Sequence, residues 1–196
     1  MTELDERVRS YLAIGETGAA ATLALREFGP EILGFLSGVL GDADADEVFS
    51  GLSERLWRSL KGFEGRCSIR TWTYVLARHE LGRFRKGLRR HAEYLVPISG
   101  VQDALAITGT RTGSATPTDR QRRFAALRDE LPVEDRMLLI LRVDRDLAWD
   151  DIALAFADDP ATLSDGARKR EAARLRKRFQ LVKQRLIARA RRASAS

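Results

Sequence analysis

Apolar residues recur at intervals of three and four along most of this chain. In the segment 42–60, Phe49, Leu52, Leu56 and Leu60 follow this spacing, which predicts one buried stripe on a helix. No segment shows convincing alternation of apolar and polar residues, the pattern that is typical of a strand. We therefore expect an all-α fold.

Five further segments have helical patterns. They cover residues 18–40, interpreted as one or two helices, and residues 68–86, 133–144, 147–156 and 167–190. Their starts carry the expected signals, because Ser68 can act as an N-cap and Pro132 suits a first helical turn. The segment Ser164-Asp165-Gly166 offers the cap of the last helix.

Residues 87–123 interrupt this pattern with basic residues, isolated apolar ones and a run of Gly, Thr, Ser and Pro. Such a run offers too little apolar surface to bury, so we expect residues 108–118 to be mobile. The sequence thus predicts two small helical domains, residues 1–90 and 124–196, joined by a flexible linker at 91–123.

The distribution of charge supports this division. The net charge is −6 over residues 1–60, +8 over 61–123, −6 over 124–159 and +10 over 160–196, which gives +6 in total. Two separate basic blocks indicate two contacts with one polyanion. The acidic blocks fit either solvated helix faces or a basic protein partner.

The last helix carries the strongest local signal. Its apolar seam comprises Ala172, Leu175, Phe179, Val182 and Leu186, and basic residues cover most of its other faces. A helix with side chains is about 10–12 Å wide and fits the DNA major groove. Packed by its seam on two shorter helices, it would be the recognition helix of a helix-turn-helix. The alternative is a solvated basic tail.

Aromatic and basic residues are interleaved between residues 63 and 85. They are Phe63, Trp72, Tyr74 and Phe84 with Arg66, Arg70, Arg78 and Arg85. Bases stack on aromatic rings while guanidinium groups hold the backbone, so this pattern suits single-stranded nucleic acid. Each aromatic residue taken singly is more typical of a core.

Other chemistry finds no support in the sequence. Cys67 is the single cysteine, which permits no intrachain disulfide and fits a reducing cytosol. His79 and His91 form no helical metal pair, and no nucleotide loop or nucleophile motif occurs. We expect no catalytic, metal-binding or cofactor-binding residues and no cofactor. The acidic start is unlike a signal peptide, and no apolar run is long enough for a membrane span, so a cytoplasmic protein is expected.

Two segments together resemble a known family. The run DADADEVFSGLSERLWRSLKGFEGRCSIRTWTYVLARHELGRFRK is similar to the second conserved region of RNA polymerase sigma factors of the extracytoplasmic-function group, in the sigma-70 family. It has an acidic helix ending in Leu-Trp, a Phe-x-Gly loop and a Trp-x-Tyr helix. LRDELPVEDRMLLILRVDRDLAWDDIALAF resembles the start of the fourth region. The likeness covers about residues 18–90 and 124–190.

The resemblance implies a protein without catalysis of its own that binds core RNA polymerase, directs it to promoter DNA and helps to melt the DNA for transcription initiation. The implied polymerase-binding residues are Asp46, Glu47, Ser50, Glu54 and Trp57. Those for the minus-ten element are Phe63, Arg66, Arg70, Arg78, His79, Arg85 and Lys86. Those of the recognition helix, for the minus-thirty-five element, are Arg168, Lys169, Arg170, Arg174, Lys177 and Arg178. Control by a separate anti-sigma protein, by phosphorylation or by expression level stays open.

The sequence also departs from the family pattern. Ser50 stands where Gln is frequent, His79 stands where Asn is usual, and Arg83 falls near a frequent Asp. These changes bear on the minus-ten sequence preference. The stretch ADDPATLSDG lengthens the usual turn before the recognition helix.

Two other functions are alternatives to this one. A helix-turn-helix regulator that does not dock on polymerase would leave the acidic helix and the aromatic loop unassigned. A nucleic-acid-modifying enzyme would need clustered acids and histidines at metal or acid-base spacing, which the sequence lacks.

Overall fold

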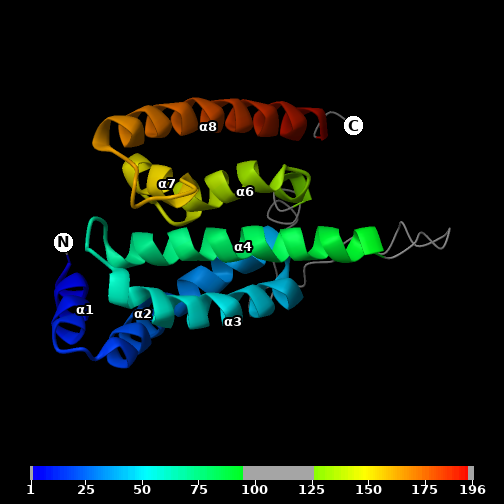
Figure 1. Ribbon diagram of the computed structural model, residues 1–196. Coiled ribbons are helices and arrows are strands. Elements are labelled where there is room, and N and C mark those ends of the chain that lie inside the picture. Colours follow the sequence, from blue (N-terminus) through cyan, green and yellow to red (C-terminus); the bar gives the residue numbers. More distant parts are fainter. Residues whose placement is uncertain (1, 95–125, 194–196) are drawn as a thin grey trace. The chain divides into compact units, whose positions relative to one another are not determined.

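The computed structural model describes residues 2–94 and 126–193, and every regular element in these two stretches is helical (Figure 1). The all-α prediction is therefore confirmed. The chain divides into two compact units, Met1–Thr110 and Arg111–Ser196. Most of the predicted linker, including the mobile stretch expected at 108–118, lies outside the described residues.

The first unit is a helical bundle. Its elements are α1 (Glu3–Ala13), α2 (Thr17–Leu40), α3 (Asp42–Ser59), the short 3-10 helix η1 (Leu60–Gly62) and α4 (Ile69–Tyr94). Helices α2, α3 and α4 pack against one another, and α1 packs against α2 (Figure 1). Leu52, Leu56 and Leu60 are buried, as their spacing predicts, whereas Phe49 is half-buried.

Phe49 lies where α2 and α3 approach closely. Gly29 on α2 is buried, and a Cβ atom added to it would stand 3.3 Å from the Phe49 ring. A glycine at this position therefore lets the two helices pack without displacing the ring. Residues 18–40 form a single helix, which continues through Pro30.

Helix α1 was not predicted, although Leu4, Val8, Tyr11 and Leu12 follow helical spacing within an otherwise charged and polar segment. It begins with a capping box: the Thr2 hydroxyl accepts the Asp5 N–H at 3.3 Å, and the Asp5 carboxylate accepts the Thr2 N–H at 2.8 Å. Val8 is its fully buried apolar residue. The box satisfies backbone N–H donors at the start of the helix, which have no partner within the helix itself.

Helix α4 begins where the sequence predicted and ends later. The Ser68 hydroxyl accepts the Thr71 N–H at 3.1 Å, which confirms Ser68 as the N-cap. The predicted end near Lys86 is wrong, since the helix continues to Tyr94. Gly87 costs a helix about 1 kcal/mol relative to alanine, and its neighbours, mostly Arg, Lys and Leu, favour helix strongly enough to carry the helix past it.

The second unit starts with a helical turn at 126–129, followed by α6 (Val133–Leu139), the π-helical turn η2 (Ile140–Asp144), α7 (Trp149–Phe156) and α8 (Asp165–Ala193). Helices α6 and α7 both pack against α8. The Ser164 hydroxyl accepts the Ala167 N–H at 3.3 Å, so the predicted cap of the last helix is confirmed.

The apolar seam of α8 is buried with one exception. Leu175 and Val182 are fully enclosed, together with Ala172 and Leu186, whereas Phe179 is only partly buried. The expected burial of Phe179 is therefore wrong. One side of its ring packs on Trp149, with ring centroids 5.5 Å apart, and the residue also lines an open apolar groove beside Val143.

Candidate functional site

Helix α3 presents an exposed, mainly acidic face. All five predicted polymerase-binding residues lie on it and are exposed: Asp46, Glu47, Ser50, Glu54 and Trp57. They lie together because Val48, Leu52 and Leu56 turn the opposite side of the helix into the core. Glu54 pairs with Arg58 at 2.6 Å.

Trp57 is the unusual member of this face, since 54% of a large apolar residue is exposed. The other tryptophan of this unit, Trp72, packs against the Phe63 ring, with centroids 5.7 Å apart. An exposed tryptophan beside carboxylates is typical of a protein-binding surface, where aromatic residues anchor the contact.

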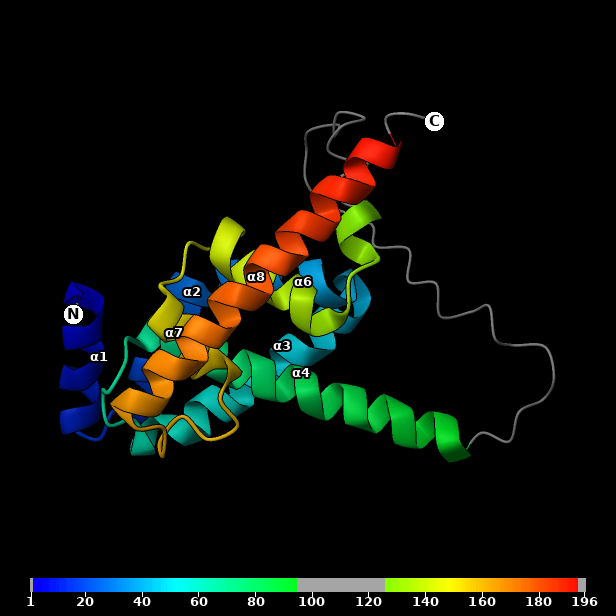
Figure 2. The ribbon, with the colours of Figure 1, turned by 90° about the horizontal axis from the view of Figure 1, so that it is seen from above.

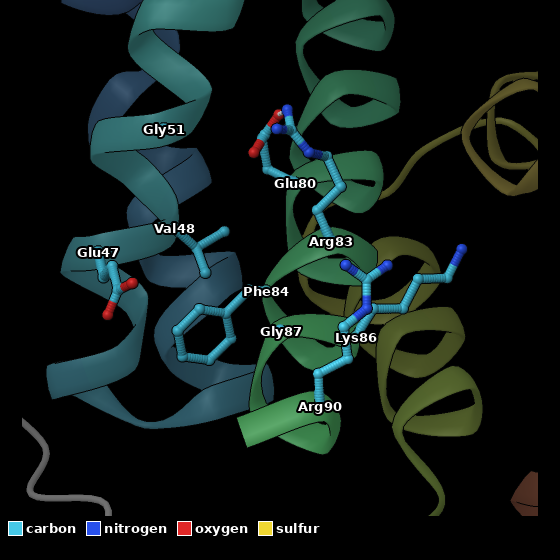
Figure 3. A pocket seen from close by; sticks show the side chains of 9 residues that line it. All are labelled: Glu47, Val48, Gly51, Glu80, Arg83, Phe84, Lys86, Gly87 and Arg90. Atoms are coloured by element: carbon cyan, nitrogen blue, oxygen red, sulfur yellow. Dashed lines mark hydrogen bonds and ion pairs between the residues drawn. The ribbon is translucent and has the colours of Figure 1, made fainter. Parts of the chain in front are cut away.

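A groove of about 390 Å³ lies between α3 and α4 (Figure 3). Figure 3 shows the Phe84 ring turned toward Val48, with Glu47 on the α3 side and Lys86 on the α4 side. A residue predicted to bind polymerase and one predicted to bind DNA therefore line the same groove.

Glu80 and Arg83, which also line this groove, belong to an ion-pair network that links α3 to α4. The Glu80 carboxylate is almost buried and pairs with Arg55 at 2.9 Å and with Arg83 at 3.0 Å. Arg83 stands near a position where the resembled family often has Asp. Its charge is partly neutralised here by Glu80, so the substitution has a structural partner in this chain.

The loop between η1 and α4, residues 63–68, carries two predicted minus-ten residues. Phe63 is half-buried against Trp72, and Arg66 is exposed and paired with Glu64. The loop is contacted by α1, because Nη2 of Arg9 donates to the Gly65 carbonyl oxygen at 3.0 Å. This contact joins residues far apart in sequence and was not predicted.

Arg70, on the first turns of α4, is held by the fold. Its Nε donates to Glu31 of α2 at 3.0 Å, and the hydroxyl of the buried Tyr74 donates to the same carboxylate at 2.7 Å. Glu31 was missed, because its position on α2 gives no hint of partners about 40 residues further along the chain. Arg70 thus combines a structural role with its predicted contact to nucleic acid.

The remaining predicted residues of α4 differ in how far they are exposed to solvent. Arg78, His79 and Arg85 are half-buried, and Lys86 is exposed. From Arg83 onward the helix carries five basic residues within eight positions. This end can attract a phosphate backbone by charge alone.

On α8, the predicted DNA-binding residues fall into two groups. Four are exposed: Lys169, Arg170, Arg174 and Lys177. Arg168 and Arg178 are half-buried. The hydrogen bond with Glu171, at 2.8 Å from Nε, raises the pKa of Arg174 above its usual value, so that side chain stays charged.

Trp149 forms a cationic cluster that the sequence did not reveal. The guanidinium groups of Arg142 and Arg176 lie 5.4 Å and 5.5 Å from the centre of its ring. Such contacts are favourable and fix the side chains in place. The three residues come from η2, α7 and α8, so only the tertiary fold brings them together.

Comparisons with known proteins identify the fold. No protein-family model matches the chain, and no curated protein matches it in sequence. Among solved structures, the sigma factor RpoE, in complex with the anti-sigma factor NepR from Bartonella quintana, is similar to it. That likeness has a TM-score of 0.52 and 21% identity, and it covers 82% of this chain and 94% of that chain. The chain has a sigma-factor fold.

One further observation concerns membranes. Within residues 2–94 and 126–193, no helix is both long enough and apolar enough to cross a bilayer.

Proposed function

We propose that this chain is a sigma factor of the extracytoplasmic-function group, which binds core RNA polymerase and directs it to promoters. The observation that carries the proposal is the separation of charge on a sigma-factor fold. An exposed acidic face on α3 lies in one unit, and an exposed basic face on α8 lies in the other. A protein that joins a basic protein surface to DNA needs both.

Each of the two units has its own role in this proposal. In this proposal residues 1–90 bind polymerase through Asp46, Glu47, Ser50, Glu54 and Trp57 and read the minus-ten element with loop 63–68 and α4. Residues 91–123 form the linker, and residues 124–196 read the minus-thirty-five element with α8. Exposed Lys169, Arg170, Arg174 and Lys177 make the DNA contacts, while Arg178 holds α8 to α6 through its ion pair with Asp135.

The protein acts without catalysing a reaction itself, in the cytoplasm, where polymerase and promoter DNA are. The similar RpoE is in complex with the anti-sigma factor NepR. We extend this to a separate anti-sigma protein as a regulator of the present chain.

The test uses the full chain and core polymerase from the organism that encodes it. The expected result is co-purification of the two, and transcription from a subset of a randomised promoter library that core polymerase alone does not transcribe. Sequencing the transcripts then gives the minus-ten and minus-thirty-five preferences. DNA binding without polymerase binding would overturn the proposal in favour of a helix-turn-helix regulator.

A further inference from the structure

Helix α1 contacts loop 63–68 at its middle and at the residue that follows it. In the middle of the loop, Nη2 of Arg9 donates to the Gly65 carbonyl oxygen at 3.0 Å. Directly after the loop, the Ile69 N–H, at the start of α4, donates to Oδ1 of Asp5 at 2.8 Å. Asp5 and Arg9 are four residues apart, so both side chains leave the same face of α1. Figures 1 and 2 show α1 beside the beginning of α4.

The conformation of Gly65, and its lack of a side chain, make room for the contact with Arg9. Its φ of +70° lies in the left-handed region, which side chains rarely adopt. A Cβ atom at this position would stand only 2.5 Å from Nη2 of Arg9. The guanidinium group therefore occupies the space that the missing side chain leaves, and backbone conformation and side chain fit each other.

Both carboxylate oxygens of Asp5 accept hydrogen bonds. The residue is 3% exposed, and its second carboxylate oxygen accepts the Thr2 N–H at 2.8 Å and the Thr2 hydroxyl at 3.0 Å. Its first oxygen satisfies one of the free N–H groups at the start of α4, where the helix dipole also favours a negative charge. One carboxylate thus caps two helices and fixes where the loop ends.

We propose that Asp5 and Arg9 are positioning residues, which hold loop 63–68 in the conformation that reads the minus-ten element. The proposal rests on the proposed function of the chain. Neither residue needs to touch DNA. A loop that is already ordered avoids the entropic cost of ordering when DNA binds, and it presents Phe63 and Arg66 in one fixed arrangement.

The test compares Arg9→Met with Arg7→Met. Arg7 is an exposed residue of the same helix, and the two changes remove the same charge. Holoenzymes made with each variant transcribe the randomised promoter library. For Arg9→Met we expect base preference at the minus-ten element to fall at least about fivefold, the scale of one lost base contact. Preference at the minus-thirty-five element and affinity for core polymerase stay as in the wild type, as does every property of Arg7→Met.

Hydrogen exchange of the free protein gives a readout that needs no polymerase. Amides of loop 63–68 should exchange about tenfold faster in Arg9→Met, and Arg9→Lys should restore part of the protection, because it keeps a charged donor. Gly65→Ala should speed exchange of the loop amides in the wild-type background. In the Arg9→Met background the same change should have a smaller effect, because the alanine Cβ then meets no guanidinium group.

The outcomes separate the two proposals. Wild-type protein that fails to bind polymerase overturns the proposed function, whatever the loop does. Wild-type protein that transcribes while Arg9→Met keeps its full minus-ten preference overturns the positioning role alone. A uniform loss of preference at both promoter elements also overturns it, since that result reports a general weakening of the holoenzyme.

Discussion

Arg178 on α8 donates from Nε to Oδ1 of Asp135 on α6 at 2.6 Å, and the Asp135 side chain is only 6% exposed. The last helix is thereby tied to the first full helix of its unit through a buried carboxylate. The other carboxylate oxygen of Asp135, Oδ2, lies 4.0 Å from Nη1 of Arg185. A residue that the sequence assigned to DNA contact is thus also a structural residue.

Replacing Arg178 by Met should lower the free energy of unfolding of the second unit by about 1.5–3 kcal/mol, because a buried carboxylate loses its closest charged partner. Lys177→Met is the matched control, since Lys177 is exposed on the same helix. Urea unfolding of the full chain, with hydrogen exchange of α6 and α8 as the readout, measures both. Equal losses in the two variants would contradict the structural role.

Core substitutions on α8 should follow burial. Leu175 is fully enclosed, so Leu175→Ala should cost about 2–5 kcal/mol. Phe179→Ala should cost less than the roughly 3–5 kcal/mol of a fully buried phenylalanine, since Phe179 is only partly buried. The same urea experiment ranks them. If Phe179→Ala were the more damaging change, the contact with Trp149 would matter more than its burial indicates.

The exposed basic face of α8 should affect DNA affinity and not folding. Arg174→Ala should leave the melting temperature unchanged, because the side chain lies outside the core. If Arg174 holds a phosphate, the salt dependence of upstream promoter binding should fall by about one in slope. If it reads a base, a loss of about 1–3 kcal/mol should come with relaxed preference at one position. A variant that melts early yet binds DNA normally would mean that the assigned face is wrong.

The acidic face of α3 should govern association with polymerase. The double change Asp46→Lys with Glu47→Lys puts like charge against a basic partner, so binding to core polymerase should weaken while the fold survives. Glu6→Lys with Glu27→Lys is the control, with the same charge change at exposed positions elsewhere in the unit. Affinity is measured by fluorescence anisotropy of labelled protein against core polymerase. Equal affinities for the two double variants would place the contact elsewhere.

The stability of the first unit should depend on pH through Asp5. Burial raises the pKa of its carboxyl, but the hydrogen bonds from Thr2 and Ile69 lower it further, so that it lies below the usual 3.8. A carboxyl with a lowered pKa stabilises the fold above 3.8 and loses this contribution as the pH falls through the folded-state pKa. The urea midpoint of the wild type should therefore approach that of Asp5→Asn between neutral pH and about pH 3. A difference that is constant with pH would exclude this role.

The sequence predicted those features that depend on local periodicity and capping. Leu52 and Leu56 lie in the core, and Ser68 and Ser164 cap their helices, because a period of three to four and a hydroxyl before a helix act over a few residues. Helix α1 was missed although Leu4, Val8 and Tyr11 follow helical spacing, because charged residues surround this short apolar stripe and the capping box at its start was not recognised.

Contacts between distant residues could not be predicted in the same way. Asp5 with Ile69, Arg70 with Glu31 and Arg178 with Asp135 each join different helices. A polar residue on a helix surface looks alike in sequence whether it faces solvent or a buried partner. The sequence therefore indicated which residues could contact polymerase or DNA, and it gave no sign of which arginines the fold already holds.

Helix α4 runs without a break for 26 residues, from Ile69 to Tyr94. It carries the buried Leu81 and, from Arg83 onward, the basic positions of its C-terminal end. Each residue turns a helix by about 100° and advances it by about 1.5 Å. Inserting or deleting one residue between Leu81 and Arg85 would therefore swing the whole basic end to another side of the unit. A loop could change its conformation to compensate for such a change. In this continuous helix, every residue after the change is rotated by the same angle. Related chains should consequently differ in length here by whole turns, about three or four residues at a time.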